Sequence, residues 1–125
     1  MMSETITIPG ELPNLNEIIK ASKAHYMAYA NMKKTHTETI TWIAKSEVKG
    51  KYNKIDLDVT WVCRDRRQDK DNIMAGGLKF ILDGLVQANV IENDGWRHIG
   101  DIVHRFKVDK KRPRIEVKIT EAGQI

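Results

Sequence analysis

Residues 55–63, with the sequence Ile-Asp-Leu-Asp-Val-Thr-Trp-Val-Cys, alternate apolar and polar side chains, and residues 71–89 follow with apolar side chains at helical spacing. Alternation with a period of two is typical of a half-buried strand, whereas the spacing in residues 71–89 favours an amphipathic helix. A strand followed by a helix that packs against it therefore forms the centre of the predicted fold. We expect five apolar side chains of that helix to face the core: Met74, Leu78, Ile81, Leu82 and Leu85.

The segments on either side add three strands and a second helical region. A short strand is predicted at residues 5–8, before Pro-Gly, and two more at about 98–108 and 115–120. Residues 17–48 have helical propensity, either as one interrupted helix or as a loop followed by a helix. The order predicts one α+β domain over residues 1–125, with about four strands in a mixed or antiparallel sheet and two main helices packed on it in two layers.

Composition limits the class of protein. The chain has 125 residues and one cysteine, Cys63, which excludes an internal disulfide framework and a thiolate zinc site. It contains no apolar run of about 20 residues, the length needed to cross a bilayer. The first residues have neither the basic nor the apolar region of a signal peptide. We therefore expect a cytoplasmic protein with no membrane partner.

The positive charge of the chain is concentrated in two segments. The net charge is +4, and residues 105–118 alone contain seven basic side chains against Asp109 and Glu116. Such clusters favour a polyanionic partner such as DNA, although a solvated surface is the alternative. The candidate DNA-binding residues of the two segments are Arg64, Arg66, Arg67, Lys70, Lys110, Lys111, Arg112 and Arg114.

Acidic side chains mark both ends of the central helix. Asp69 and Asp71 flank its predicted N-terminus, where a carboxylate can cap free backbone N–H groups and interact with the helix dipole. Capping does not require a pair of acids. Lys79 and Asp83 lie further along the same helix and can form an exposed i,i+4 ion pair, and Asp94 lies beyond the helix end.

The glycines and acids of this region also fit a metal-dependent site. Gly76 and Gly77 each cost about 1 kcal/mol relative to alanine in a helix, which fits either the close approach of another molecule or tight packing against the sheet. Clustered carboxylates suit Mg²⁺ or Mn²⁺. Such an ion could neutralise a scissile phosphate and activate water, and a nearby lysine could stabilise the transition state.

Three segments together resemble the RusA family of Holliday junction resolvases. They are residues 67–72 (RQDKDN), 79–85 (KFILDGL) and 90–94 (VIEND). The resemblance extends loosely from the first strand to residues 119–121. It implies a homodimeric, Mg²⁺-dependent endonuclease that resolves four-way DNA junctions by paired symmetric nicks in recombination and repair.

The resemblance also implies roles for individual residues. Asp69, Asp71 and Asp94 would bind the metal, and Lys79 would be a further catalytic residue. Asn72 and Asp83 match supporting positions of the motif.

The chain departs from the family pattern at two positions. Asp71 and Lys79 are four residues further apart than in the pattern, which leaves Lys79 on the same helix face one turn further along, about 40° away. Asn93 replaces a frequent aspartate. Two functional alternatives stay open: a nuclease for other branched DNA, and a DNA-binding module that does not cut. A structural protein without a nucleic-acid partner is disfavoured by the basic segment at 105–118.

Overall fold

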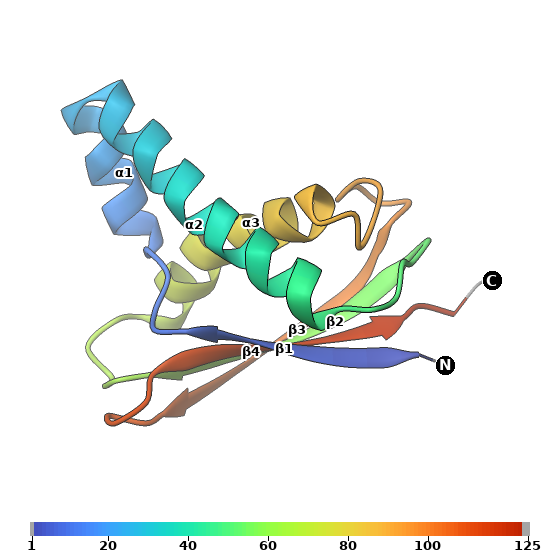
Figure 1. Ribbon diagram of the computed structural model, residues 1–125. Coiled ribbons are helices and arrows are strands. Elements are labelled where there is room, and N and C mark those ends of the chain that lie inside the picture. The colour runs from blue at the N-terminus through green and yellow to red at the C-terminus, as the bar shows by residue number, and fades with distance from the viewer. Residues whose placement is uncertain (1, 124–125) are drawn as a thin grey trace.

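Three helices cover one face of a four-stranded sheet in the computed structural model, which describes residues 2–123 (Figure 1). No helix in this range is both long and apolar enough to cross a membrane. The elements in chain order are β1 (Ser3–Pro9), α1 (Leu15–Ala24), α2 (Tyr26–Glu47), β2 (Ile55–Cys63), α3 (Lys70–Gln87), β3 (Ile99–Val108) and β4 (Arg114–Glu121).

The sheet is mixed, with the strand order β1-β4-β2-β3. β2 and β3 are parallel and are joined through α3, as parallel neighbours need a crossover connection. β4 is antiparallel to both β1 and β2 and lies between them. The predicted α+β class, the mixed sheet of four strands and the two-layer arrangement are confirmed.

The core lies between the helix-facing side of the sheet and the two helices α2 and α3. The apolar positions of β2 that the alternation predicted are all buried, from Ile55 to Cys63. Ile81 and Leu85 of α3 are buried, as expected, and Phe80 is buried as well. The other expected core residues of this helix are only half-buried: Met74, Leu78 and Leu82.

The helical region before β2 is interrupted once. His25 has an extended backbone between α1 and α2, and its Nδ1 accepts a hydrogen bond from the Met27 N–H at 3.1 Å, which caps α2. Asn14 and Glu17 form a capping box at the start of α1. The region is therefore an interrupted helix and not a loop followed by a helix, which was the other expected alternative. As a result, three helices rather than two cover the sheet.

Gly76 and Gly77 allow α3 to lie close to its neighbours. A Cβ atom on Gly77 would lie 2.6 Å from the Trp61 ring, and one on Gly76 would overlap the backbone at Pro13–Leu15. Tight packing, one of the two expected explanations, thus accounts for both glycines. This packing fixes the N-terminal half of α3 against the sheet and against the segment that precedes α1.

Candidate functional site

The N-terminus of α3 presents two carboxylates that no other side chain engages. Asp69 is the N-cap residue, with an extended backbone, but its side chain makes no capping hydrogen bond. Asp71 lies in the first turn, and both residues are exposed. Within residues 2–123 neither carboxylate has an ion-pair or hydrogen-bond partner. Their oxygens are therefore free to bind a ligand, and capping by a side-chain hydrogen bond does not explain the pair.

The loop that carries Asp69 is tied to the segment before α1. The Asn14 side-chain amide donates to Gln68 Oε1 at 2.9 Å. Arg64 contacts Glu11 both through its backbone N–H and through its guanidinium, whose Nε lies 3.4 Å from Glu11 Oε1. These contacts join three segments far apart in sequence and fix the position at which α3 begins.

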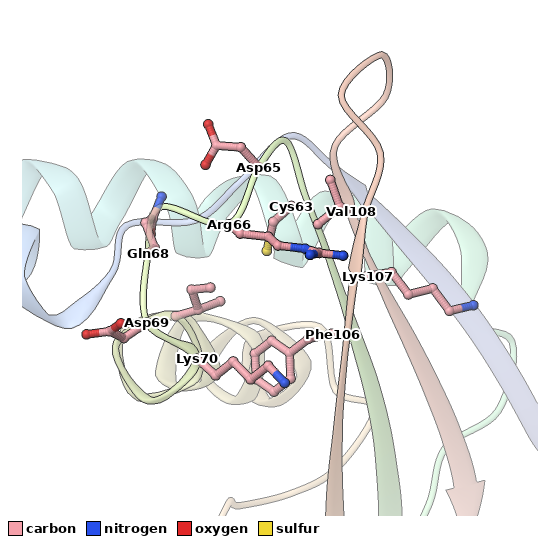
Figure 2. Close-up of a pocket in the computed structure, with 10 residues that line it drawn as sticks. Cys63, Asp65, Arg66, Gln68, Asp69, Lys70, Phe106, Lys107 and Val108 are labelled. Carbon is pink, nitrogen blue, oxygen red and sulfur yellow. The ribbon is translucent and has the colours of Figure 1, made fainter.

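A cavity of about 530 Å³ lies beside this helix terminus, between the β2–α3 loop and β3. Its apolar lining includes Cys63 and Phe106, and the Lys70 ammonium lies 5.5 Å from the centroid of the Phe106 ring. Figure 2 shows Arg66 reaching across to β3 and the Asp69 carboxylate pointing outward, away from Phe106. The residues that line the cavity therefore include three cationic ones, Arg66, Lys70 and Lys107, and the uncommitted carboxylate of Asp69.

The β3–β4 turn brings further positive charge to the same end of the sheet. Its backbone is joined to the end of β2 by a hydrogen bond from the Asp109 N–H to the Cys63 carbonyl at 2.8 Å. Asp109 Oδ1 also accepts from the backbone N–H groups of Lys111 and Arg112, which orders the turn. The side chains of residues 110–112 are exposed, and Figure 1 shows this turn and the β2–α3 loop at the same end of the molecule. The two basic segments of the sequence thus meet in space.

Some of the candidate DNA-binding residues form ion pairs with acidic side chains, and others do not. Arg114 is ion-paired with both Asp109 and Glu116, at 3.1 and 2.9 Å, and Arg67 pairs with Asp65 at 3.7 Å. In the part of the chain that the structure describes, five of the candidates have no acidic partner within ion-pair distance: Arg66, Lys70, Lys110, Lys111 and Arg112.

A second charged cluster lies near the other end of α3. The Lys79 ammonium is 2.6 Å from Asp94 Oδ2 and 3.0 Å from Asp83 Oδ1. Lys33 of α2 approaches the other oxygen of Asp83 at 4.0 Å. The hydrogen bond with Asp94 is the main reason that the pKa of Lys79 is raised, and the same bond lowers the pKa of Asp94. Both groups are therefore charged at neutral pH.

The structure does not bring the three predicted metal ligands together in one chain. Asp71 and Asp83 are twelve residues apart on α3, about 18 Å along the helix axis, and Asp94 lies with Lys79 and Asp83. Across residues 2–123 there is no group of three or more acidic, histidine or cysteine side chains placed to hold a metal ion. Asn72 is half-buried in the first turn of α3, directly after Asp71.

Two residues of these sites were not predicted from the sequence. Phe106 lines the cavity, and Lys33 joins the second cluster from α2. The alternation of apolar residues in β3 could have placed Phe106 on the helix-facing side of the sheet, but not beside Lys70. No local pattern connects Lys33 with Asp83, because their contact depends on how α2 packs on α3.

Comparison with known proteins identifies one family. A sequence profile described as Endodeoxyribonuclease RusA matches residues 8–120, which is nearly the whole chain and includes both charged clusters. No curated protein matches the chain.

Proposed function

The chain belongs to the RusA family of endodeoxyribonucleases, and on that premise we propose that it resolves Holliday junctions by Mg²⁺-dependent, paired symmetric nicks as a homodimer. The substrate is branched DNA, and the role is in recombination and repair, in the cytoplasm. One structural observation supports the proposal above the others. Two uncommitted carboxylates, Asp69 and Asp71, lie at the start of α3, and Asp69 lines a cavity with cationic side chains at its edge.

Asp69 and Asp71 fit a hard divalent cation. Carboxylate oxygens are the ligands that Mg²⁺ prefers, and it is commonly bound through one or two carboxylates together with substrate phosphates and water. Neither side chain has to break a hydrogen bond or an ion pair to serve as a ligand. When bound, Mg²⁺ or Mn²⁺ would neutralise charge on the scissile phosphate and lower the pKa of an attacking water.

Asp94 is the third predicted ligand, and we propose that a second copy of the chain supplies it. Asp94 lies with Lys79 near the far end of α3, so it cannot join Asp69 and Asp71 of its own chain without a large rearrangement. A twofold dimer in which the two α3 helices lie antiparallel across the axis would place each end of one α3 against the opposite end of the other, because twofold contacts are reciprocal. Each of the two sites would then contain two acids from one copy and Asp94 with Lys79 from the other.

The basic surface would hold the DNA arms through their phosphates. Arg66 and Lys70 line the same cavity as Asp69, and the turn at residues 110–112 lies at the same end of the molecule (Figure 1). Among the described residues these basic side chains have no acidic partner, so their charge is available to a polyanion. Phosphate contacts position DNA but carry no sequence information. Selectivity for a junction would therefore come from the shape of the DNA that both halves of the dimer can contact.

Cleavage of a labelled mobile four-way junction, with and without Mg²⁺, tests the proposal. We expect nicks at symmetric positions in two strands only when Mg²⁺ or Mn²⁺ is present, and much slower cutting of a linear duplex. A flap substrate is measured in parallel. Faster cutting of the flap than of the junction would replace the proposed substrate, and binding without any cutting would favour a non-catalytic DNA-binding module.

Charge reversal of the β3–β4 turn is expected to weaken junction binding. In the variant Lys110→Glu with Arg112→Glu, two side chains without acidic partners become repulsive to phosphate. The slope of log affinity against log salt should become shallower by roughly 0.9 per lost phosphate contact. The measurement is binding to a fluorescent junction over a series of salt concentrations.

A matched control changes the same amount of charge elsewhere. Lys20 and Lys45 are exposed on α1 and α2 and have no ion-pair partner among the described residues. The variant Lys20→Glu with Lys45→Glu therefore has the same net charge as the variant of the turn. We expect this control to bind with nearly the wild-type salt slope. Equal slopes for both double variants would mean that the turn at residues 110–112 is a solvated surface.

A further inference from the structure

Trp96 is an aromatic side chain with almost no contact to the rest of the protein. It is 96% exposed, in the segment between α3 and β3, two residues after Asp94. The other two tryptophans differ from it: Trp61 is buried at 2% exposure, and Trp42 is on the outer surface of α2 at 73%. Burying an aromatic ring of this size stabilises a fold considerably, so Trp96 contributes little to folding where it is.

The backbone on both sides of Trp96 is well ordered by hydrogen bonds. The Gly95 carbonyl accepts from the N–H groups of His98 and Ile99, each at 3.0 Å. The His98 ring is within hydrogen-bond distance, 2.8 Å, of the Asn53 carbonyl. Asp94 is held by Lys79. The indole therefore projects from a fixed turn, and little conformational entropy would be lost when it binds a partner.

The surroundings of Trp96 are polar. The indole lines a shallow hollow of about 480 Å³, and the five other residues of its lining are Glu92, Asn93, Gly95, Arg97 and His98. None of those five is a large apolar residue, whereas the core of a protein–protein contact surrounds its aromatic anchors with other well-packed groups. The nearby charges are of both signs: Lys79 is ion-paired with Asp94, and the lining itself contains one acid, Glu92, and one arginine, Arg97. An isolated, rigid aromatic ring among polar groups fits a nucleobase better than an apolar protein surface.

We propose that Trp96 stacks on an unpaired or unstacked base of branched DNA, next to the site that contains Asp94 and Lys79. The inference rests on the proposed function, because it takes branched DNA as the substrate. Every base has a π face, so stacking tolerates any sequence. A linear duplex offers no free base face, whereas bases at a branch point can unstack at low cost. Trp96 would therefore favour branched and single-stranded DNA over duplex.

Tryptophan fluorescence tests the stacking directly and without cleavage. The full chain carrying Trp42→Phe keeps only buried Trp61 and exposed Trp96 as emitters. It is titrated, in the absence of metal, with a short single-stranded oligothymidylate. We expect saturable quenching of the emission and protection of Trp96 from iodide. Unchanged emission at DNA concentrations that saturate binding would overturn the proposal.

Substitution of Trp96 separates stacking from other roles. Trp96→Leu keeps an apolar side chain but cannot stack, and we expect it to bind the junction and single-stranded DNA roughly 10-fold more weakly, with duplex affinity unchanged. Trp96→Phe should restore most of the affinity, and Trp42→Leu is the matched control that should leave it unchanged. An equal loss for junction and duplex would overturn the proposal. Dissociation of the Trp96→Leu dimer in sedimentation, with Trp96→Phe dimeric, would assign Trp96 to a protein interface instead.

These measurements distinguish this inference from the proposed function. If the wild-type protein cuts junctions but shows no quenching of Trp96, only the stacking role fails. If single-stranded DNA quenches the emission of Trp96 but the protein cuts no junction, the proposed reaction fails while the stacking role stands.

Discussion

Asp69→Asn, Asp71→Asn and Asp94→Asn are each expected to abolish junction cleavage while junction binding is kept or becomes tighter. Each change removes one carboxylate that the proposed site needs for its divalent cation. Each also removes a negative charge close to the DNA, which reduces repulsion of the phosphates. Asparagine has nearly the same shape as aspartate, so the fold should be unchanged.

Cleavage and binding are measured on the same labelled junction, with Mg²⁺ for cleavage and without it for binding. Asp101→Asn is the matched control, because Asp101 is an exposed acid of β3 whose carboxylate has no ion-pair partner in the described part of the chain. This control should cut at the wild-type rate. A single variant of the three that retained near wild-type cleavage would remove its residue from the proposed metal site.

Mixed dimers test whether Asp94 acts across the dimer. Chains with Asp69→Asn and chains with Asp94→Asn are co-expressed with two different tags, and the mixed dimer is purified through both. If each site takes Asp94 from the opposite copy, the mixed dimer has one site with both changes and one intact site. It should then nick one strand, although both parental dimers are inactive. An inactive mixed dimer would mean that the three acids act within one chain.

Lys79→Ala is expected to lower the cleavage rate by two or more orders of magnitude, which is typical for loss of one group that stabilises a transition state. The Lys79 ammonium lies 2.6 Å from Asp94, so it would enter the site together with that ligand. Junction binding should change little, because one exposed lysine is a small part of the basic surface. Single-turnover rates at saturating enzyme measure this effect separately from binding.

The same variant distinguishes catalysis from a simple ion pair. Lys79 is mostly exposed, and exposed ion pairs contribute under about 1 kcal/mol to the free energy of unfolding. Lys79→Ala and Asp83→Ala should therefore lower the melting temperature slightly and to a similar extent. If Lys79 serves only as an ion pair, both variants will cut at nearly the wild-type rate. A fully active Lys79→Ala enzyme would place the lysine outside the catalytic site.

The pH dependence of that small stability difference has a defined sign. The hydrogen bond from Lys79 lowers the pKa of Asp94, so the contribution of the pair is fully present above the ordinary carboxyl pKa. It is lost as the pH falls through the lowered pKa of Asp94. The melting temperatures of wild type and Lys79→Ala should consequently differ at neutral pH and converge in strong acid. A difference that persists in strong acid would have to come from packing of the lysine stem.

The sequence by itself determined the main elements of the sheet and the long central helix. The alternation in β2 and the apolar spacing in α3 are local patterns, because each face of a strand or helix is set by the period of its own backbone. The same is true of Asp69 and Asp71, which are two residues apart and necessarily meet at the start of α3. For these features, near neighbours in the chain are also near neighbours in space.

Tertiary structure alone decided which distant residues meet. The contact of Lys79 with Asp94 spans fifteen residues and depends on the turn after α3, where Asn89 adopts a left-handed backbone with φ 61°. Lys33 reaches Asp83 only because α2 packs on α3. Likewise, the reason for glycine at positions 76 and 77 of α3 is visible only in the surfaces that pack against them. Such contacts depend on the packing of whole elements, to which many weak interactions contribute, and no short stretch of sequence encodes them.

The same reason explains why Asp94 is separated from Asp69 and Asp71. A motif records the order of three acids along the chain but not the distance between them. The rigid length of α3 keeps Asp71 about 18 Å along the helix axis from Asp83, beside which Asp94 lies, and Asp69 precedes Asp71 at the start of the helix. The exposure of Trp96 was also invisible in the sequence, since a tryptophan is usually buried by the elements that fold around it. The sequence pattern indicated which residues could act, and the packing of α3 against the sheet and against the other helices decided where they lie.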